Sequence, residues 1–272
     1  MITSMQNRLV KDVAALLANR KDRLAERAYV IEGIRMAKEA PEQDIRGICI
    51  SESFERSPHP KVWETCEKLG YEVLSDDVFR KLSDTRTPQG VLMIMNAKEY
   101  TPADVIAASS EKDGQQVPLL VLTEDIQDPG NLGTILRAGE GAGITGAIFS
   151  KGTVDIYNPK TIRSTMGSIF RIPFCYVEDL PAEIGKLRDQ KIEVFAAHLQ
   201  GSVSYDRKDY TGASAFLIGN EGNGLTDKCT AAASAAVHIP MCGSVESLNA
   251  GVAASVLLYE AARQRRTTSC RV

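Results

Sequence analysis

Six short apolar segments in the second half of the chain constrain its fold more than any other feature. Helical stretches or polar loops separate them, and they read VPLLVL, GAIFS, FCYV, IEVFAAHL, SAFLIG and AAVHIP. Near-continuous apolar strands of this kind are typical of a parallel sheet that helices cover on both faces. The sequence therefore predicts an α/β fold for this half of the chain.

The first part of the chain predicts a smaller α/β unit. Apolar strand signals at AYVIEG, RGICI, YEVLS and GVLMIM alternate with helical signals, among them a helix over about Pro60–Leu69. The polar stretch that follows has no strong period and contains Pro102 and Gly114, which favours a linker. We expect a small domain over residues 1–98, a linker over 99–116 and the larger domain over 117–272.

Composition excludes several classes of protein. No stretch approaches the roughly 20 apolar residues that span a bilayer, and the N-terminus lacks the apolar core of a signal peptide, so we expect a cytoplasmic protein. The six cysteines are scattered without a C-x-x-C pair or a nearby histidine cluster, which predicts reduced, mostly buried thiols and no metal site. His238, alone in an apolar run, is expected to be structural.

Polar loops directly follow three of the apolar segments. They are LTEDIQDPGNLG, GNEGNGL and MCGSVESLN. Ligands of open α/β sheets bind at the carboxyl ends of the strands, so these loops are expected to share one site. A G-x-G-x-x-G match at Gly141, Gly143 and Gly146 ends a helix instead of opening one, so it does not indicate a dinucleotide fold.

Each loop also has a purely structural interpretation. Asn131 is expected to stand at a helix start as its N-cap, and Arg137 to be a solvated residue of that helix. Ser247 and Asn249 are natural capping residues of the last helix. Glu221 stands among three glycines that allow the backbone to approach a ligand closely, and here function is slightly favoured.

Together and in this order, the loops resemble the three motifs of the SpoU/TrmH family of RNA 2′-O-ribose methyltransferases, part of the SPOUT class. The patterns are N-x-G-x-x-x-R, G-N-E-G-x-G-L and I-P-M-x-G-x-x-x-S-L-N, and the resemblance covers about residues 117–263. The N-terminal unit resembles the family's L30e-like substrate-binding domain through VIEGIRMAKEA and TPQGV.

The resemblance implies an α/β-knot domain with a deep trefoil knot that binds S-adenosylmethionine. It places the methyl donor against backbone groups of the second and third motifs, with the 196–201 loop on one side. The implied donor-binding residues are Ala197, Gly201, Gly219, Asn220, Glu221, Ile239, Met241 and Leu248.

The implied reaction is attack of a ribose 2′-hydroxyl on the donor's methyl group. Family accounts make the motif arginine a base, but guanidinium stays protonated in nearly all proteins. We expect Arg137 to stabilise negative charge on the oxygen instead. The remaining implied catalytic residues, which position the ribose and Arg137 or shape the pocket, are Asn131, Ser247, Asn249 and Glu221.

The implied partners are RNA and a second copy of the chain, with no membrane and no metal. Ribosomal RNA is favoured over tRNA by analogy alone. The net charge of −3 argues against binding through bulk charge, but basic residues gather near both ends, and as RNA contacts we expect Arg8, Lys11, Arg35, Arg263 and Arg265. The alternatives are the same reaction on tRNA and a noncatalytic RNA-binding protein of this fold; a small-molecule or protein methyltransferase is disfavoured.

Overall fold

The structure, a computed structural model, describes residues 1–111, 117–199 and 202–269. They form two compact units. Unit 1 comprises residues 1–98 together with 155–170, and unit 2 comprises the described residues of 99–154 and 171–272. The 155–170 segment thus lies in the second half of the sequence but in the first unit of the structure.

Unit 1 contains a four-stranded mixed sheet in the order β1-β4-β2-β3. β2 and β3 pair in parallel, and β4 pairs antiparallel with β1 and β2. The strands are β1 (Ala28–Glu32), β2 (Ile45–Ser51), β3 (Glu72–Leu74) and β4 (Val91–Asn96). Each one coincides with a predicted strand signal, so those predictions are confirmed.

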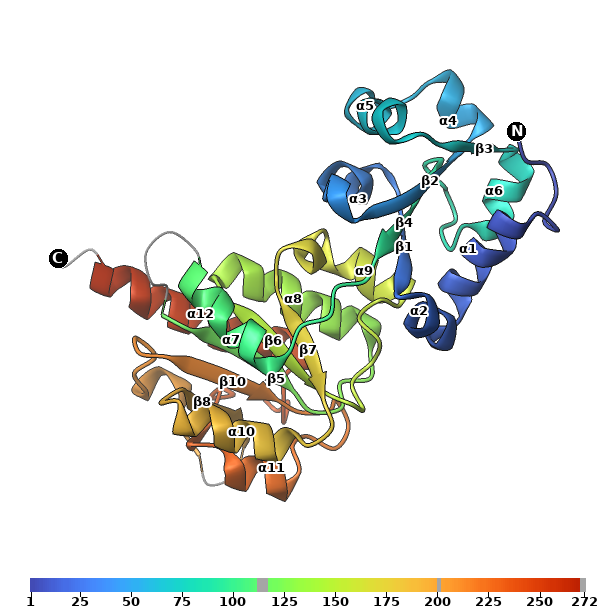
Figure 1. Ribbon diagram of the computed structural model, residues 1–272. Helices are drawn as coiled ribbons and strands as arrows, with labels where there is room; N and C mark the ends of the chain where they lie inside the picture. The colour runs from blue at the N-terminus through green and yellow to red at the C-terminus, as the bar shows by residue number, and fades with distance from the viewer. Residues whose placement is uncertain (112–116, 200–201, 270–272) are drawn as a thin grey trace. The chain divides into compact units, whose positions relative to one another are not determined.

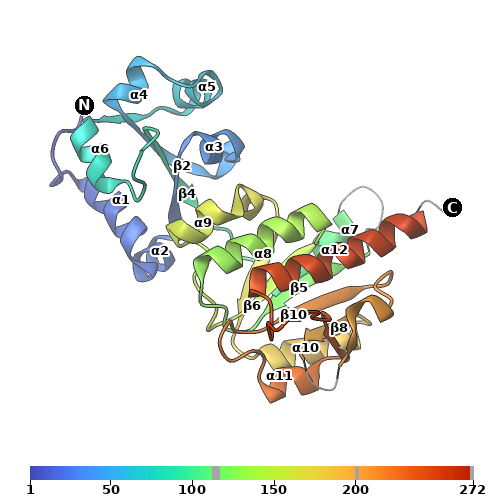
Figure 2. The ribbon, with the colours of Figure 1, turned by 180° about the vertical axis from the view of Figure 1, so that it is seen from behind.

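Helices cover both faces of this sheet (Figures 1 and 2). On one face, apolar residues of α1 and α6 form a core with Val30, Cys49 and Leu92 of the strands. The other face carries α3, α5 and α9, which contact β1, β2 and β4. The helices are α1 (Arg8–Ala18), α2 (Arg20–Glu26), α3 (Ile34–Glu39), α4 (Glu52–Arg56), α5 (Pro60–Leu69), α6 (Asp76–Leu82) and α9 (Pro159–Thr165).

A buried ion pair and a ring contact attach the 155–170 segment to unit 1. The Arg23 guanidinium lies 2.8 Å from the Asp155 carboxylate, and the two side chains are 5% and 13% exposed. Arg23 also donates to the carbonyls of Leu16 and Leu17, so its donors are well used. The Tyr29 and Tyr157 rings stack with their centroids 4.3 Å apart.

The segment expected to be a linker contains a packed helix, α7 (Pro102–Glu111). Val105 of this helix is fully buried in the core of unit 2 beside Leu120 and Ile148. The Asp104 carboxylate accepts a hydrogen bond from the Thr101 backbone N–H, and the Thr101 hydroxyl accepts one from the Asp104 N–H. This is the reciprocal capping pattern of a helix start, and it is the sequence signal that the polar composition obscured.

Unit 2 is built on a seven-stranded sheet in the order β7-β6-β5-β10-β8-β11-β9, with every pair parallel. All six predicted apolar segments are strands, and the two-residue β9 was not predicted. The strands are β5 (Leu119–Thr123), β6 (Gly146–Ser150), β7 (Phe174–Val177), β8 (Glu193–Ala197), β9 (Val203–Ser204), β10 (Ser214–Ile218) and β11 (Ala235–His238).

Helices cover both faces of this sheet too, as predicted. α7, α10 (Leu180–Asp189) and α11 (Asp227–Ala232) contribute to the core on one face. On the other face α8 (Pro129–Ala142) and α12 (Ala250–Ser269) pack side by side (Figure 2). No helix within the described ranges combines the length and apolar character needed to cross a membrane.

The Arg23–Asp155 pair predicts a large effect on the stability of unit 1. Arg23→Ala leaves the Asp155 carboxylate buried without its cation, which costs about 3–5 kcal/mol in comparable pairs. The single tryptophan, Trp63, lies on α5 of unit 1. Urea unfolding followed by Trp63 fluorescence therefore measures the decrease in the free energy of unfolding. The matched control is Arg80→Ala, whose exposed pair with Asp77 is worth at most about 1 kcal/mol. Equal, small losses in both variants would contradict a structural role for the buried pair.

Candidate functional site

The three polar loops predicted to share a site come together around the Glu221 carboxylate. One carboxylate oxygen accepts hydrogen bonds from the Asp128 backbone N–H (3.0 Å) and from the Asn131 side-chain amide (2.8 Å). The other accepts from the Gln127 backbone N–H at 3.0 Å. The loop after β10 is therefore bonded directly to the loop after β5.

Asn131 extends this connection to the third loop. Its side-chain oxygen accepts a hydrogen bond of 2.8 Å from the Asn249 amide. The Asn249 oxygen in turn accepts from the backbone N–H groups of Gly251 and Val252, at the start of α12. Asn249 thus fulfils its expected capping role while joining the loop after β11 to the other two.

The predicted N-cap of α8 is wrong. The helix begins at Pro129, and its cap is Asp128, whose carboxylate accepts from the Asn131 backbone N–H at 2.8 Å. Proline is favoured in the first position of a helix, and aspartate is a good cap before it. Because Asn131 is not needed as the cap, its side chain is available to bridge Glu221 and Asn249.

The glycine-rich loop after β10 folds tightly on itself. The backbones of Asn220 and Gly224 bond to each other in both directions, and the Asn220 side chain accepts from the N–H groups of Gly222 and Asn223. A Cβ atom on Gly219 would lie 2.4 Å from the Gly224 carbonyl carbon. Only glycine fits this close approach, so steric exclusion of a side chain explains why glycine stands at position 219.

A second carboxylate fixes the far end of the same loop. Glu124 is buried at the end of β5 and accepts from the Thr226 N–H (2.8 Å) and hydroxyl (2.7 Å). Thr226 is the N-cap of α11, so Glu124 sets where the loop ends and the helix begins. Glu124 was not among the residues predicted for the site, although it directly follows a buried strand, the same feature that marked the neighbouring loop residues.

The hydrogen bonds also determine the charge state of Glu221. Partial burial by itself would raise the pKa of this carboxyl. The Asn131 amide and the backbone N–H groups of Gln127, Asp128 and Glu221 itself outweigh that effect and hold the pKa below its ordinary value of 4.5. Glu221 is therefore a carboxylate at neutral pH.

A cavity of about 410 Å³ opens beside these loops. It falls within the range of roughly 300–1,000 Å³ typical of small-molecule sites. Its walls come from the ends of β8, β10 and β11, from the loops after β10 and β11, and from α12, whereas the loop after β5 does not line it. Of the residues expected to bind a donor or act in catalysis, those that line it are Ala197, Gly219, Asn220, Glu221, Ile239, Met241, Ser247 and Leu248.

Other expected residues lie elsewhere. Gly201 falls outside the described residues. Asn131 and Asn249 do not line the cavity and act on it through Glu221 and the α12 cap. His238, expected to be structural, shares a hydrogen bond of 2.8 Å with the Ser202 hydroxyl and also lines the cavity wall.

Arg137 lies outside the cavity on the edge of α8 that faces α12. Along this edge, Thr134 comes close to Gly251, and Gly141 comes close to Tyr259. Residues 134, 137 and 141 share one helix face. The Arg137 side chain is exposed and has no hydrogen bond or ion pair with any described residue. Its guanidinium is therefore available to an external anion.

The two C-terminal arginines expected to contact RNA both have partners within the chain. The Arg265 guanidinium donates to the carbonyls of Val117, Pro118, Tyr210 and Gly212 at 2.7–3.0 Å. Burial lowers the pKa of this group, and its donors are committed to holding α12 against the strand starts. Arg263 is exposed but paired with Glu260. Arg8, Lys11 and Arg35 are exposed.

The cysteines offer no alternative chemistry in the described part of the chain. All five described thiols are free, and four are buried. Burial raises the pKa of the Cys229 thiol to about 12, with a hydrogen bond to Glu124 adding to the effect, so this thiol is protonated. No group of three or more His, Cys, Asp or Glu side chains among the described residues is arranged to hold a metal ion.

Comparison with known protein families gives two matches. Residues 118–259 match the SpoU rRNA Methylase family, and residues 7–93 match the MRM3-like substrate binding domain. The chain is 30% identical over 260 residues to the 23S rRNA (guanosine(2553)-2′-O)-methyltransferase RlmP of Bacillus subtilis. That similarity covers 95% of this chain and 97% of the relative.

Two solved structures are similar to this chain over nearly its whole length. The SpoU methyltransferase AviRb from Streptomyces viridochromogenes, in complex with the cofactor AdoMet, is 27% identical with a TM-score of 0.83, covering 96% of this chain and 100% of that one. An AdoMet-bound rRNA methyltransferase from Sinorhizobium meliloti is 30% identical with a TM-score of 0.77, covering 96% and 97%.

The bonds to Glu221 predict a pH-dependent stability. The folded pKa lies below the unfolded one, so the contribution is fully present above about pH 4.5 and is lost as pH falls through the folded pKa. Glu221→Gln removes the charge and places an NH₂ group beside N–H donors. Thermal unfolding of both proteins from about pH 7 to about pH 3 should show a wild-type advantage that narrows at the acid end. A constant difference across the range would show that the Glu221 charge plays no part.

Proposed function

The chain belongs to the SpoU rRNA methylase family, and we propose that it transfers a methyl group from S-adenosylmethionine to a ribose 2′-hydroxyl of large-subunit ribosomal RNA. The observation that carries this proposal is the chain of hydrogen bonds from Glu221 through Asn131 to Asn249, which joins all three motif loops beside one cavity. Two relatives that are 23S rRNA 2′-O-methyltransferases support ribosomal RNA over tRNA as the substrate. A ribosomal substrate also fits the expected cytoplasmic location.

The cavity walls fit S-adenosylmethionine. Ile218, Val237 and Leu248 offer apolar surface for an adenine ring, and the irregular backbone at residues 219–225 and 239–241 offers polar groups. The Glu221 carboxylate at the wall suits a cationic ligand. The donor, when bound, supplies an electrophilic methyl group on a sulfonium.

In the proposed reaction, Arg137 provides the positive charge that stabilises the transition state. Guanidinium groups stay protonated in nearly all proteins, so arginine is a poor general base. It can instead stabilise negative charge that develops on the attacking 2′-oxygen or lies on the adjacent phosphate. Asn131 and Asn249 fix the starts of α8 and α12, and so orient the helix edge that carries Arg137. The exposed Ser247 hydroxyl on the cavity wall is placed to hold the ribose.

A second copy of the chain completes the proposed site. Val252 and Tyr259, one helical heptad apart on α12, are 46% and 48% exposed, so this face of the helix leaves apolar surface uncovered. Tyr259 contacts the same edge of α8 that carries Arg137. Since Arg137 does not line the cavity of its own chain, a homodimer packed through α12 would bring it to the cavity of the other copy.

Arg137→Ala should separate catalysis from donor binding. We expect donor affinity to stay within about twofold of wild type while the methyl-transfer rate falls by about 10²–10³, the usual cost of removing one charge-stabilising donor. Calorimetry with S-adenosylmethionine and transfer of labelled methyl into deproteinised ribosomal RNA measure the two quantities, with the tRNA fraction assayed in parallel. Arg137→Lys, which keeps the charge, should retain part of the activity.

Parallel loss of donor binding and transfer in Arg137→Ala would show that the residue is structural. Transfer into tRNA alone would replace the substrate while keeping the reaction. RNA binding without any transfer by the wild-type protein would favour the noncatalytic alternative.

Mixing two inactive variants tests whether the site is shared between copies. Arg137→Ala lacks the guanidinium, and Gly219→Ala places a Cβ against Gly224 and so damages the cavity. If the site combines Arg137 of one copy with the cavity of the other, random subunit exchange should restore about a quarter of wild-type activity. A mixture as inactive as either variant alone would place both elements in one copy.

A further inference from the structure

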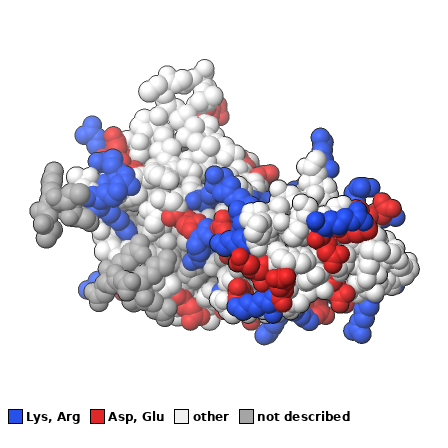
Figure 3. All heavy atoms as spheres, turned by 90° about the horizontal axis from the view of Figure 1, so that it is seen from above, with Lys and Arg blue, Asp and Glu red and all other residues white. Residues whose placement is uncertain are grey.

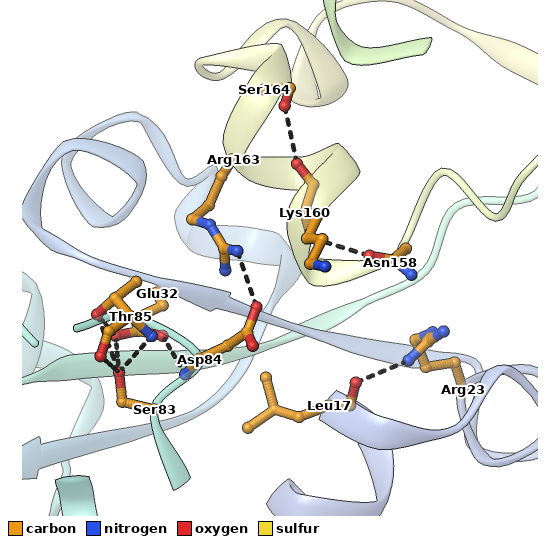
Figure 4. A network of polar contacts seen from close by, with 10 residues as sticks. All are labelled: Leu17, Arg23, Glu32, Ser83, Asp84, Thr85, Asn158, Lys160, Arg163 and Ser164. Atoms are coloured by element: carbon orange, nitrogen blue, oxygen red, sulfur yellow. Dashed lines mark hydrogen bonds and ion pairs between the residues drawn. The ribbon is translucent and has the colours of Figure 1, made fainter. Parts of the chain in front are cut away.

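The loop of residues 83–89 in unit 1 is held from two sides. The Glu32 carboxylate, at the end of β1, accepts hydrogen bonds from the hydroxyls of Ser83 and Thr85 and from the Asp84 backbone N–H. From the other side, the Arg163 guanidinium of α9 forms an ion pair of 2.8 Å with the Asp84 carboxylate. Figure 4 shows Arg163 pointing towards Asp84, with Glu32, Ser83 and Thr85 grouped beside the same loop.

The same loop is bonded to the start of α3. The Gln89 side-chain oxygen accepts a hydrogen bond of 2.9 Å from the Ile34 backbone N–H. Gly33, next to it, has a φ of 97°, which favours glycine. We call the 83–89 loop, residues 32–35 and α9 together the arginine corner.

Two arginines of this corner differ from the others in unit 1. Among the arginines of residues 1–98 and 155–170, only Arg35 and Arg86 lack a hydrogen-bond or ion-pair partner in the described structure. Both side chains are exposed, and so is that of Lys160 on α9, which also has no such partner. On the face drawn in Figure 3, many Lys and Arg side chains lie beside Asp or Glu.

The acidic residues of the corner cancel only part of its positive charge. Asp84 is paired with Arg163, and Glu32 leaves one carboxylate to set against Arg35, Arg86 and Lys160. The corner is therefore net positive, and the loop that carries Arg86 is held in shape by the bonds to Glu32 and Arg163. Arginine is the side chain best suited to bidentate bonds with phosphate, and an ordered loop loses little entropy on binding.

We propose that the arginine corner binds the phosphate backbone of the substrate RNA, with Arg35 and Arg86 contacting phosphates and Arg163 and Glu32 holding the loop in place. This inference rests on the proposed function for the identity of the partner. It moves the expected RNA contact surface of unit 1 away from Arg8 and Lys11 of α1, which lies on the opposite face of the sheet from α3 and α9. It also gives the 155–170 segment a role in RNA recognition through Arg163 and Lys160.

The test compares two charge-matched double variants of the full chain. Arg35→Ala with Arg86→Ala removes the corner's arginines, while Lys61→Ala with Lys81→Ala removes two exposed, unpaired lysines of α5 and α6. Binding to deproteinised large-subunit ribosomal RNA is measured over a range of KCl concentrations. We expect the corner variant to bind at least about tenfold more weakly, with a salt slope lower by about 1.5, as two lost phosphate contacts require.

Donor binding and Trp63 fluorescence should be unchanged in both variants, which shows that they are folded. In the transfer assay the corner variant should raise the KM for RNA with little change in kcat. Equal affinity and equal salt slope in the corner variant and wild type would overturn the proposal, as would equal losses in the two double variants. The binding comparison stands even if the wild-type chain transfers no methyl group, an outcome that would count against the proposed function alone.

Discussion

The hydrogen bonds of the Glu221 carboxylate are the constraint on which the site depends. A carboxylate within a glycine-rich loop would ordinarily turn to solvent, but three N–H donors from the loop after β5 and the first turn of α8 hold it in place. Asn131 in turn accepts a hydrogen bond from Asn249, whose oxygen accepts one from Gly251 at the start of α12. One side chain therefore sets the relative positions of three loops that are far apart in the sequence. The wall of the cavity, the start of α8 and the start of α12 all follow from that arrangement.

The parallel order of the strands makes this arrangement possible. β5 pairs with β10, β10 with β8 and β8 with β11, so the ends of β5, β10 and β11 lie along one edge of the sheet. Helices α8 and α12 then leave this edge side by side, which places Arg137 on a surface shared by both. In unit 1, by contrast, the corner that we assign to RNA is built partly from residues 155–170, which follow β6 of unit 2 in the sequence. A chain cut near residue 116 would therefore separate α9 from the strand that it packs against.

Features that depend on local sequence were predicted well, and features that depend on distant contacts were not. Apolar runs identified the six principal strands of unit 2 because strands buried on both faces must be apolar throughout. The meeting of the three loops followed from parallel topology alone. The true cap of α8 was missed although the Asp128–Pro129 pair is a local signal, because Asn131 was also an acceptable cap. Residues 155–170 belong to unit 1 in part because Asp155 pairs with Arg23, which lies 132 positions earlier in the sequence. The Arg265 guanidinium likewise donates hydrogen bonds to four carbonyls that are distant in the sequence. No pattern within either segment reveals such contacts.

The identity of the methylated product tests the central claim most directly. Ribosomal RNA from a strain that lacks the protein is incubated with the purified chain and deuterated S-adenosylmethionine, then digested to nucleosides and analysed by mass spectrometry. The account predicts a single nucleoside that carries the label on its ribose 2′-oxygen. Label on a base, or no label in the presence of measured donor binding, would contradict it.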